Sequence, residues 1–221
     1  MSYYPVFLDL RGRRGLVVGG GVVASQKIAG LLRSGADVTV VAPRAIETIL
    51  RLAEEGRVTL RARDYSPGDM LGIDLAVAAT GDAQVDRRVC ADARRARALV
   101  NVVDSPAQSS FIAPAILERG DLQVAVSTSG ASPSFAVFVR DRLAAEIGPE
   151  YAAALSVLRG VRERLRAEAR PMEERKRILG AIAAAGLVER LRSRDHGGVD
   201  ELLRSLVGEA VTLERLGVDL G

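Results

Sequence analysis

The chain has 221 residues, enough for one large domain or for a nucleotide-binding domain with smaller additions. Hydrophobic residues make up 48% of the sequence and aromatic residues only 4%, so the core must consist mainly of Val, Ala, Leu and Ile, which suits α/β layers. The formal charge of +3 does not indicate a nucleic-acid partner, and a single cysteine with a single histidine excludes an intrachain disulfide and a conventional zinc site.

The first hundred or so residues alternate between strand and helix patterns. β-Branched runs bounded by Gly or Pro indicate buried strands, and longer segments with apolar residues at helical spacing indicate helices. The expected strands span residues 15–18, 37–43, 58–62, 74–80 and 98–104, and the expected helices span 22–35, 45–55 and 83–97. This order predicts the fold class α/β, with a Rossmann-type doubly wound parallel sheet in residues 1–112.

The pattern changes after Pro106. Residues 113–147 indicate a short helix or turn, a strand over 122–127, a Gly/Ser loop and one amphipathic helix over 135–148. This small α+β segment is too short for a core of its own, so we expect it to pack on the first domain or on a second copy of the chain. Residues 148–221 predict a C-terminal helical domain.

The strongest local motif follows the first strand. In "LVVGGGVVASQK", Gly19, Gly21 and Ala24 match the G-x-G-x-x-[GA] dinucleotide fingerprint and open a helix. Glycine lets the backbone approach a pyrophosphate, whose charge is met by N–H groups at the helix N-terminus. Alone, the motif is also compatible with a glycine turn that binds nothing. Within an alternating β/α pattern it predicts nucleotide binding.

The usual acidic residue after the second strand is missing from this sequence. Val41 and Ala42 are followed there by Pro43 and Arg44, and Asp37 lies at the opposite, N-terminal end of the strand. A carboxylate at that position normally binds the ribose hydroxyls of NAD, whereas an arginine can accept the 2′-phosphate of NADP. The spacing therefore leaves the choice between NAD and NADP open.

Two further candidates follow buried strands of the same sheet. Thr80, Gly81 and Asp82 end one strand, and Asp104 ends another. Ligands of open α/β sheets gather at the carboxyl ends of the strands, although either segment could equally be an ordinary turn or helix cap. A carboxylate beside a nicotinamide could act as a general base or stabilise a cation, which makes Asp104 the candidate catalytic residue.

This sequence lacks residues that several other classes of protein require. Tyr65 and Tyr151 are followed four positions later by Asp69 and Leu155, so the Tyr-x-x-x-Lys pair of short-chain dehydrogenases is missing. Neither a phosphate-binding P-loop nor a G-x-S-x-G elbow occurs. No apolar run approaches the roughly 20 residues that span a bilayer, and the N-terminus lacks the order of a signal peptide. We therefore expect a cytoplasmic protein without a membrane partner.

Four motifs in order resemble the precorrin-2 dehydrogenase family, which includes the N-terminal part of siroheme synthase. They are the segment from Tyr3 to Pro43, "AVAATGD", "NVVDSPAQSSFIAPAI" and "VAVSTSGASPSFAVFVRDRL". The resemblance runs from about Tyr4 to Leu143. It implies NAD-dependent oxidation of precorrin-2, an anionic tetrapyrrole, to sirohydrochlorin in siroheme or cobalamin synthesis. Some members also insert a divalent metal, so ferrochelation is left open.

The resemblance also implies roles for individual residues, and it favours NAD. Its dinucleotide contacts fall on Gly19, Gly20, Gly21, Val22, Val23, Pro43, Arg44, Thr80, Gly81 and Asp82. The implied substrate contacts are Asn101, Ser127, Thr128, Ser129 and Gly130, with Asp104 as the catalytic residue and no metal ligand. The middle segment would form a homodimer. Because the tail is short, we expect a stand-alone enzyme without the methyltransferase domain of fused siroheme synthases.

One alternative comes from a different functional class. The first hundred residues would also suit an NAD(H)-sensing regulatory module without tetrapyrrole chemistry. Asp104 and the "STSGASPS" loop argue against it, since a sensor of nucleotide alone requires neither. Among enzymes, a different Rossmann oxidoreductase, or a chelatase that has lost dehydrogenation, is the next alternative.

Overall fold

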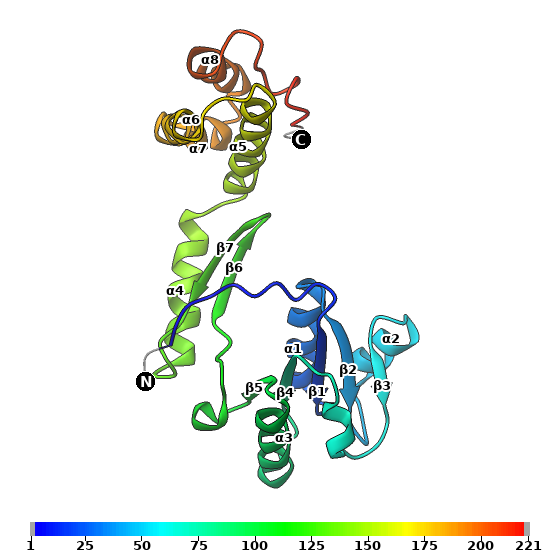
Figure 1. Cartoon of the computed structure of the whole chain (residues 1–221). Helices are drawn as coiled ribbons and strands as arrows, with labels where there is room; N and C mark the ends of the chain where they lie inside the picture. The colour runs from blue at the N-terminus through cyan, green and yellow to red at the C-terminus, as the bar shows by residue number, and fades with distance from the viewer. Residues whose placement is uncertain (1–2, 219–221) are drawn as a thin grey trace. The chain divides into compact units, whose positions relative to one another are not determined.

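The computed structural model describes residues 3–218 of the chain (Figure 1). Its internal contacts divide the chain into two compact units. The first comprises the described residues up to Ala113 together with Ser129–Ala131, and the second comprises Pro114–Thr128 and the described residues from Ser132 onward. The division into three parts at residues 112 and 147 stays a prediction.

A five-stranded parallel sheet forms the centre of the first unit. Its strands lie in the order β3-β2-β1-β4-β5. They are β1 (Arg14–Val18), β2 (Asp37–Val41), β3 (Thr59–Arg61), β4 (Leu75–Ala78) and β5 (Leu99–Val102). From β1 the chain adds strands first on one side of the sheet (β2, β3) and then on the other (β4, β5). Open α/β sheets bind ligands at this switch point between β1 and β4.

Helices cover both faces of this sheet, as the predicted fold class requires. The connecting elements are α1 (Val22–Arg33), α2 (Glu47–Glu54), α3 (Ala83–Ala96) and the 3₁₀ turns η1 (Pro67–Met70) and η2 (Pro106–Gln108). Ile28 of α1 and Ile49 of α2 pack with Val40 on one face, whereas Val89 of α3 and Met70 of η1 pack with Leu16 on the other. The central strands are therefore apolar on both sides, which explains their unbroken Val- and Ala-rich sequences.

The second unit begins with a hairpin that the sequence analysis assigned wrongly in part. The segment expected to be a short helix or turn is β6 (Ala115–Arg119), which pairs antiparallel with β7 (Leu122–Val126). Gly120 has a φ of 57° in the tight turn between them. The apolar run before this turn is too short to separate a strand from a helix, and the pairing with β7 decides the outcome.

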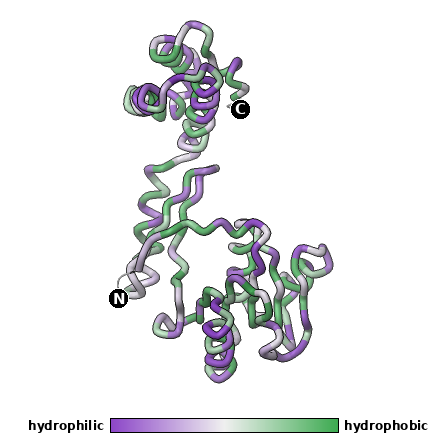
Figure 2. Tube along the Cα trace, viewed as in Figure 1, coloured by the Kyte–Doolittle hydropathy of each residue, from purple (hydrophilic) through white to green (hydrophobic). Residues whose placement is uncertain are grey.

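A long helix, α4 (Pro133–Glu146), packs against this hairpin. Its first half, around Phe135–Val139, is almost entirely hydrophobic (Figure 2). Only Ala136 of α4 is buried, so the expected amphipathic pattern with one buried apolar face is wrong. Large hydrophobic side chains of α4 are therefore left at the surface of the chain.

The rest of the second unit is helical, as predicted. Its helices are α5 (Glu150–Ala167), α6 (Met172–Ala184), α7 (Leu187–Arg192) and α8 (His196–Leu206). They enclose a core of their own, in which Val161, Leu165, Ile182 and Leu203 are fully buried. Arg192 of α7 binds Glu150 at 2.6 Å and donates to the carbonyl oxygen of Glu146, which ties the helices to the end of α4.

Candidate functional site

The glycine-rich turn after β1 is shaped by close backbone packing. Gly19 has a φ of 128°, and a Cβ at this residue would clash with the carbonyl oxygen of Ala79. A Cβ at Gly20 would clash with the carbonyl oxygen of Arg44. The first two glycines are therefore required by the protein itself, because the ends of β2 and β4 press against them.

The third glycine faces open space. Apart from Gly21 and its two chain neighbours, no atom of the described residues lies within 4 Å of the position that a Cβ at Gly21 would take. Gly21 is the N-cap of α1 and has no side chain to cap the helix, and Val22 and Val23 behind it are exposed. The amides of a 12-residue helix thus begin beside an open cradle, an arrangement that favours a phosphate.

The end of β2 lies beside this turn. The backbone N–H of Ile46 donates to the carbonyl oxygen of Gly20 at 2.9 Å, which fixes the loop that carries Pro43 and Arg44. Both residues are exposed. Within residues 3–218, the Arg44 side chain has no ion pair or hydrogen bond, so no described acidic side chain neutralises its charge.

The loop after β4 is held by a buried carboxylate that the sequence analysis missed. Asp86 of α3 is 8% exposed and accepts the Thr80 hydroxyl at 2.7 Å and the Thr80 backbone N–H at 3.3 Å. Asp82 caps α3 by accepting the N–H of Gln84 at 2.7 Å, and Gly81 is exposed with a φ of 77°. The only sequence signal for Asp86 is an acid in the first turn of a helix.

Asp104 stands two residues beyond the end of β5. Its φ of 57° lies in the left-handed region, which aspartate tolerates better than most residues, and its side chain is exposed. Among the described residues, none hydrogen-bonds to the Asp104 carboxylate. This carboxylate is therefore available to a ligand at the same edge of the sheet as the glycine turn.

The segment after Asp104 turns back and seals the edge of β5. The hydroxyls of Ser109 and Ser110 accept the backbone N–H groups of Val102 and Val100 at 2.9 and 2.8 Å. The Asn101 amide, 8% exposed, donates to the carbonyl oxygen of Phe111 at 3.0 Å. Asn101 thus has a structural partner, and its contact with a substrate stays a prediction.

The predicted substrate loop is shared between the two units. Ser127 and Thr128 belong to the second unit, where the Thr128 hydroxyl donates to the carbonyl oxygen of Ser132 at 2.9 Å. Ser129 and Gly130 belong to the first unit. A Cβ at Gly130 would lie 3.8 Å from the ring of Pro106, so this part of the loop lies beside the segment that follows Asp104.

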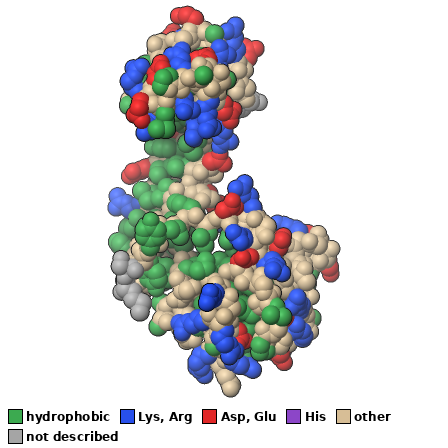
Figure 3. All heavy atoms as spheres, in the orientation of Figure 1, with side chains coloured by type: hydrophobic (Ala, Val, Ile, Leu, Met, Phe, Trp, Pro, Cys, Tyr) green, Lys and Arg blue, Asp and Glu red, His purple; other side chains and the backbone are tan. Residues whose placement is uncertain are grey.

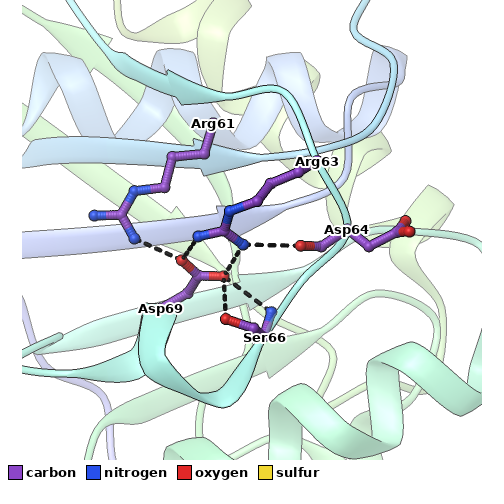
Figure 4. Close-up of polar contacts among 5 residues, drawn as sticks. All are labelled: Arg61, Arg63, Asp64, Ser66 and Asp69. Carbon is purple, nitrogen blue, oxygen red and sulfur yellow. Dashed lines mark hydrogen bonds and ion pairs between the residues drawn. The ribbon is translucent and has the colours of Figure 1, made fainter.

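A charged cluster at the end of β3 was also missed. The Asp69 carboxylate, 1% exposed, accepts Arg63 through both oxygens at 2.6 and 2.8 Å, Arg61 at 2.5 Å and the N–H of Ser66 at 2.9 Å (Figure 4). The Arg63 guanidinium, more than any other group, holds the pKa of Asp69 well below its usual range, against the opposing effect of burial.

The described residues contain neither a membrane-spanning helix nor a cluster of metal ligands. None of the helices within residues 3–218 is long and apolar enough to cross a membrane. The same part of the chain contains no group of three or more His, Cys, Asp or Glu side chains arranged to hold a metal ion.

Comparisons with known proteins match both units. The family described as NAD(P)-binding matches residues 6–115, and the family of sirohaem biosynthesis protein central domains matches residues 119–146. Siroheme synthase 3 of Aeromonas hydrophila is 37% identical over 95% of this chain and 45% of its own length. Siroheme synthase of Chromobacterium violaceum is 38% identical over 88% of this chain and 42% of its own length. The chain therefore spans less than half the length of these two curated relatives.

A solved structure resembles both units as well. It is that of SirC, described as a precorrin-2 dehydrogenase, with a TM-score of 0.76 and 28% sequence identity. The match covers 92% of this chain and 98% of that chain.

Proposed function

Because the chain belongs to the family that comprises precorrin-2 dehydrogenase and the N-terminal part of siroheme synthase, we propose that it oxidises precorrin-2 to sirohydrochlorin with NAD. One observation carries the proposal. The edge of the sheet that holds the open cradle at Gly21 also holds the exposed Asp104 carboxylate, one strand beyond the switch point. A dinucleotide site and a candidate acid–base group thus belong to the same unit.

The residues of the turn fit the dinucleotide. Its pyrophosphate carries negative charge and needs N–H donors without a side chain in the way. Gly21 leaves that space open, whereas Gly19 and Gly20 pack directly against the backbone of Ala79 and Arg44. When bound, NAD supplies the hydride acceptor. The chain's own contribution is to hold the cofactor through α1, the Arg44 loop and the Thr80 loop.

Asp104 is the proposed catalytic residue. Oxidation of precorrin-2 removes a hydride and a proton, and an exposed carboxylate without a protein partner can accept that proton. Ser129 and Gly130, beside the segment after Asp104, are the proposed substrate contacts of the first unit. Their backbone N–H groups and hydroxyl suit a substrate rich in carboxylates.

The experiment is an anaerobic assay with enzymatically generated precorrin-2 and NAD. NADH formation and the change in macrocycle absorbance should appear together and depend on both substrates. Asp104→Ala should lower turnover by at least about 100-fold, the usual contribution of a general base, with unchanged NAD binding in calorimetry. Asp37→Ala is the matched control, because Asp37 is an exposed acid at the opposite end of the same sheet. NAD binding without NADH formation in the wild type would contradict the proposal.

We further propose that the chain forms a homodimer through α4. Phe135, Val137 and Phe138 are 41 to 55% exposed, Ile116 of β6 is 43% exposed, and the two phenylalanine rings lie 5.8 Å apart. In Figure 3, hydrophobic side chains gather over α4, whereas α5–α8 present mixed charges. An exposed apolar face of this kind usually marks a protein–protein contact. In the first unit, Val6 and Phe7 of the N-terminal segment are also exposed.

The cellular location and the insertion of metal are also proposals. A cytoplasmic location fits the sequence, whose single cysteine, Cys90, is buried and cannot form an intrachain disulfide. Insertion of a divalent metal into the product would be a second activity, and adding Fe²⁺ to the assay after oxidation is complete would test it.

A further inference from the structure

The charged cluster at the end of β3 lies next to the end of β2. Arg61 pairs with Val41 in the sheet, and its carbonyl oxygen accepts the backbone N–H of Ala42 at 3.2 Å. In dinucleotide-binding folds the residues that follow β2 meet the ribose of the adenosine half. The side chain of Arg61 therefore starts beside the place where the ribose 2′ position would lie.

Within the cluster, only some of the N–H groups of Arg61 form hydrogen bonds. Arg63 binds both oxygens of Asp69 and also donates to the carbonyl oxygen of Asp64 at 2.8 Å. Arg61 reaches Asp69 through one terminal nitrogen alone, and within residues 3–218 its other nitrogens have no partner. Because Arg63 already neutralises Asp69, the charge of Arg61 is in excess, and Asp69 holds the guanidinium in place.

Other charged side chains near this edge of the sheet do not cancel the positive charge of Arg61. Arg44 follows β2 and makes no ion pair in the described part of the chain. The Asp64 carboxylate points away from the cluster (Figure 4), and Glu47 at the start of α2 faces Arg51 at 3.7 Å. The carboxylate that normally repels a 2′-phosphate has no counterpart at the end of β2, where Val41 and Ala42 lead into Pro43.

We infer that the ribose end of the site accepts a 2′-phosphate, so that the chain binds NADP as well as NAD, with Arg61 and Arg44 contacting the phosphate. This inference rests on the proposed dinucleotide site and extends it to cofactor choice. Arg61 is a specificity residue, and Asp69 is the positioning residue that orients it. Arginine suits this task because its planar guanidinium can bind Asp69 with one edge and a phosphate with another.

Titration calorimetry with NAD and NADP tests the inference without relying on turnover. At low salt, the dissociation constant for NADP should lie within about tenfold of that for NAD, which corresponds to a small difference in binding free energy. A dissociation constant for NADP more than about tenfold above that for NAD would overturn the inference and leave the proposed function intact. Failure of both nucleotides to bind would instead contradict the proposed function.

A pair of variants assigns the effect to the residue. Arg61→Met should raise the dissociation constant for NADP by roughly tenfold and that for NAD by less than about twofold, because only the phosphate loses a charged partner. Arg57→Met is the matched control: Arg57 is also exposed, but it precedes β3 at the other end of the strand and faces Glu55 at 3.5 Å. Equal losses for both nucleotides, or no loss, in Arg61→Met would overturn the assignment. If Arg61→Met does not fold by circular dichroism, Arg61→Gln takes its place with the same expected selectivity, because it also removes the positive charge.

Discussion

The two units use polar and apolar side chains in opposite ways. In the first unit, Asp69, Asp86 and Asn101 are buried, and each holds a loop at or near the carboxyl ends of the strands. In the second unit, α4 leaves Phe135 and Phe138 exposed. Buried polar groups fix a backbone shape for a small polar ligand, whereas an exposed apolar face suits another protein surface. The difference fits the proposals that the first unit binds the dinucleotide and that the second unit mediates assembly.

The largest effect on the first unit is expected for a substitution in the glycine turn after β1. Gly20→Ala should destabilise the fold by at least about 3 kcal/mol, because the new Cβ would clash with the carbonyl oxygen of Arg44. Gly21→Ala adds the same methyl group one residue later, where it meets no protein atom. We therefore expect normal thermal unfolding for Gly21→Ala with at least about tenfold weaker NAD binding in calorimetry.

The two glycine variants control for each other. Both are expected to lose NAD binding, but only one for reasons of stability. If Gly21→Ala bound NAD as tightly as the wild type, the open cradle would not be where the pyrophosphate lies. If Gly20→Ala unfolded at the wild-type temperature, the close packing against Arg44 would not constrain the turn.

A substitution in the helical core tests whether the second unit can be destabilised without loss of NAD binding by the first. Leu165 is fully buried among α5–α8, so Leu165→Ala should cost about 2 to 5 kcal/mol of stability in the second unit. Because the proposed dinucleotide site lies in the first unit, NAD binding should persist at temperatures where the helices have melted. Calorimetry with parallel circular dichroism measures both. Met172→Ala, which truncates a 59% exposed side chain of α6, is the control and should change neither.

The first unit could be predicted from the sequence largely because its signals are local. The alternation of strands and helices predicts the sheet, and the glycine motif from Gly19 to Ala24 predicts the position of the turn after β1. Asp86 and Asp69 escaped prediction because an isolated acid has no periodic pattern. Their partners, Thr80, Arg61 and Arg63, come together only through the turns that precede and follow β4.

The second unit was harder to predict for a related reason. Strand β6 owes its conformation to pairing with β7, and the apolar residues of α4 do not concentrate on one buried face. Neither property is visible in a helical or alternating pattern. Elements that depend on a partner strand or a partner protein carry weak signals of their own.

The buried carboxylate of the first unit predicts a dependence on pH. The pKa of Asp69 is lowered in the folded state, mainly by Arg63, so its ion pairs stabilise the fold above the ordinary carboxyl pKa. This contribution should be lost progressively below about pH 5, as pH falls toward the folded-state pKa. Asp69→Asn should lose about 2 kcal/mol at neutral pH and show a flatter acid dependence of the free energy of unfolding. Asp64→Asn, an exposed neighbour, is the control, and parallel acid profiles for wild type and Asp69→Asn would refute the assignment.

The smallest effect on stability is expected for a substitution on α4. The same substitution tests whether the exposed apolar residues of α4 contact another protein. Phe138 is 52% exposed, so Phe138→Glu should change the free energy of unfolding of the single chain by less than about 0.5 kcal/mol. The same change places a charge in the proposed dimer contact, where burial without a partner is costly. Sedimentation velocity should therefore show a dimer for the wild type and a monomer for Phe138→Glu.

The control for this variant is Met172→Glu, which introduces the same charge at an exposed apolar residue of α6, away from α4. It should remain dimeric. A dimer that survives Phe138→Glu unchanged would mean that α4 faces solvent and that assembly uses another surface, with exposed Val6 and Phe7 of the N-terminal segment as the next place to mutate. A wild-type chain that is monomeric at working concentration would contradict the proposed homodimer. The hydrophobic face of α4 would then be an exposed surface that only a different protein could cover.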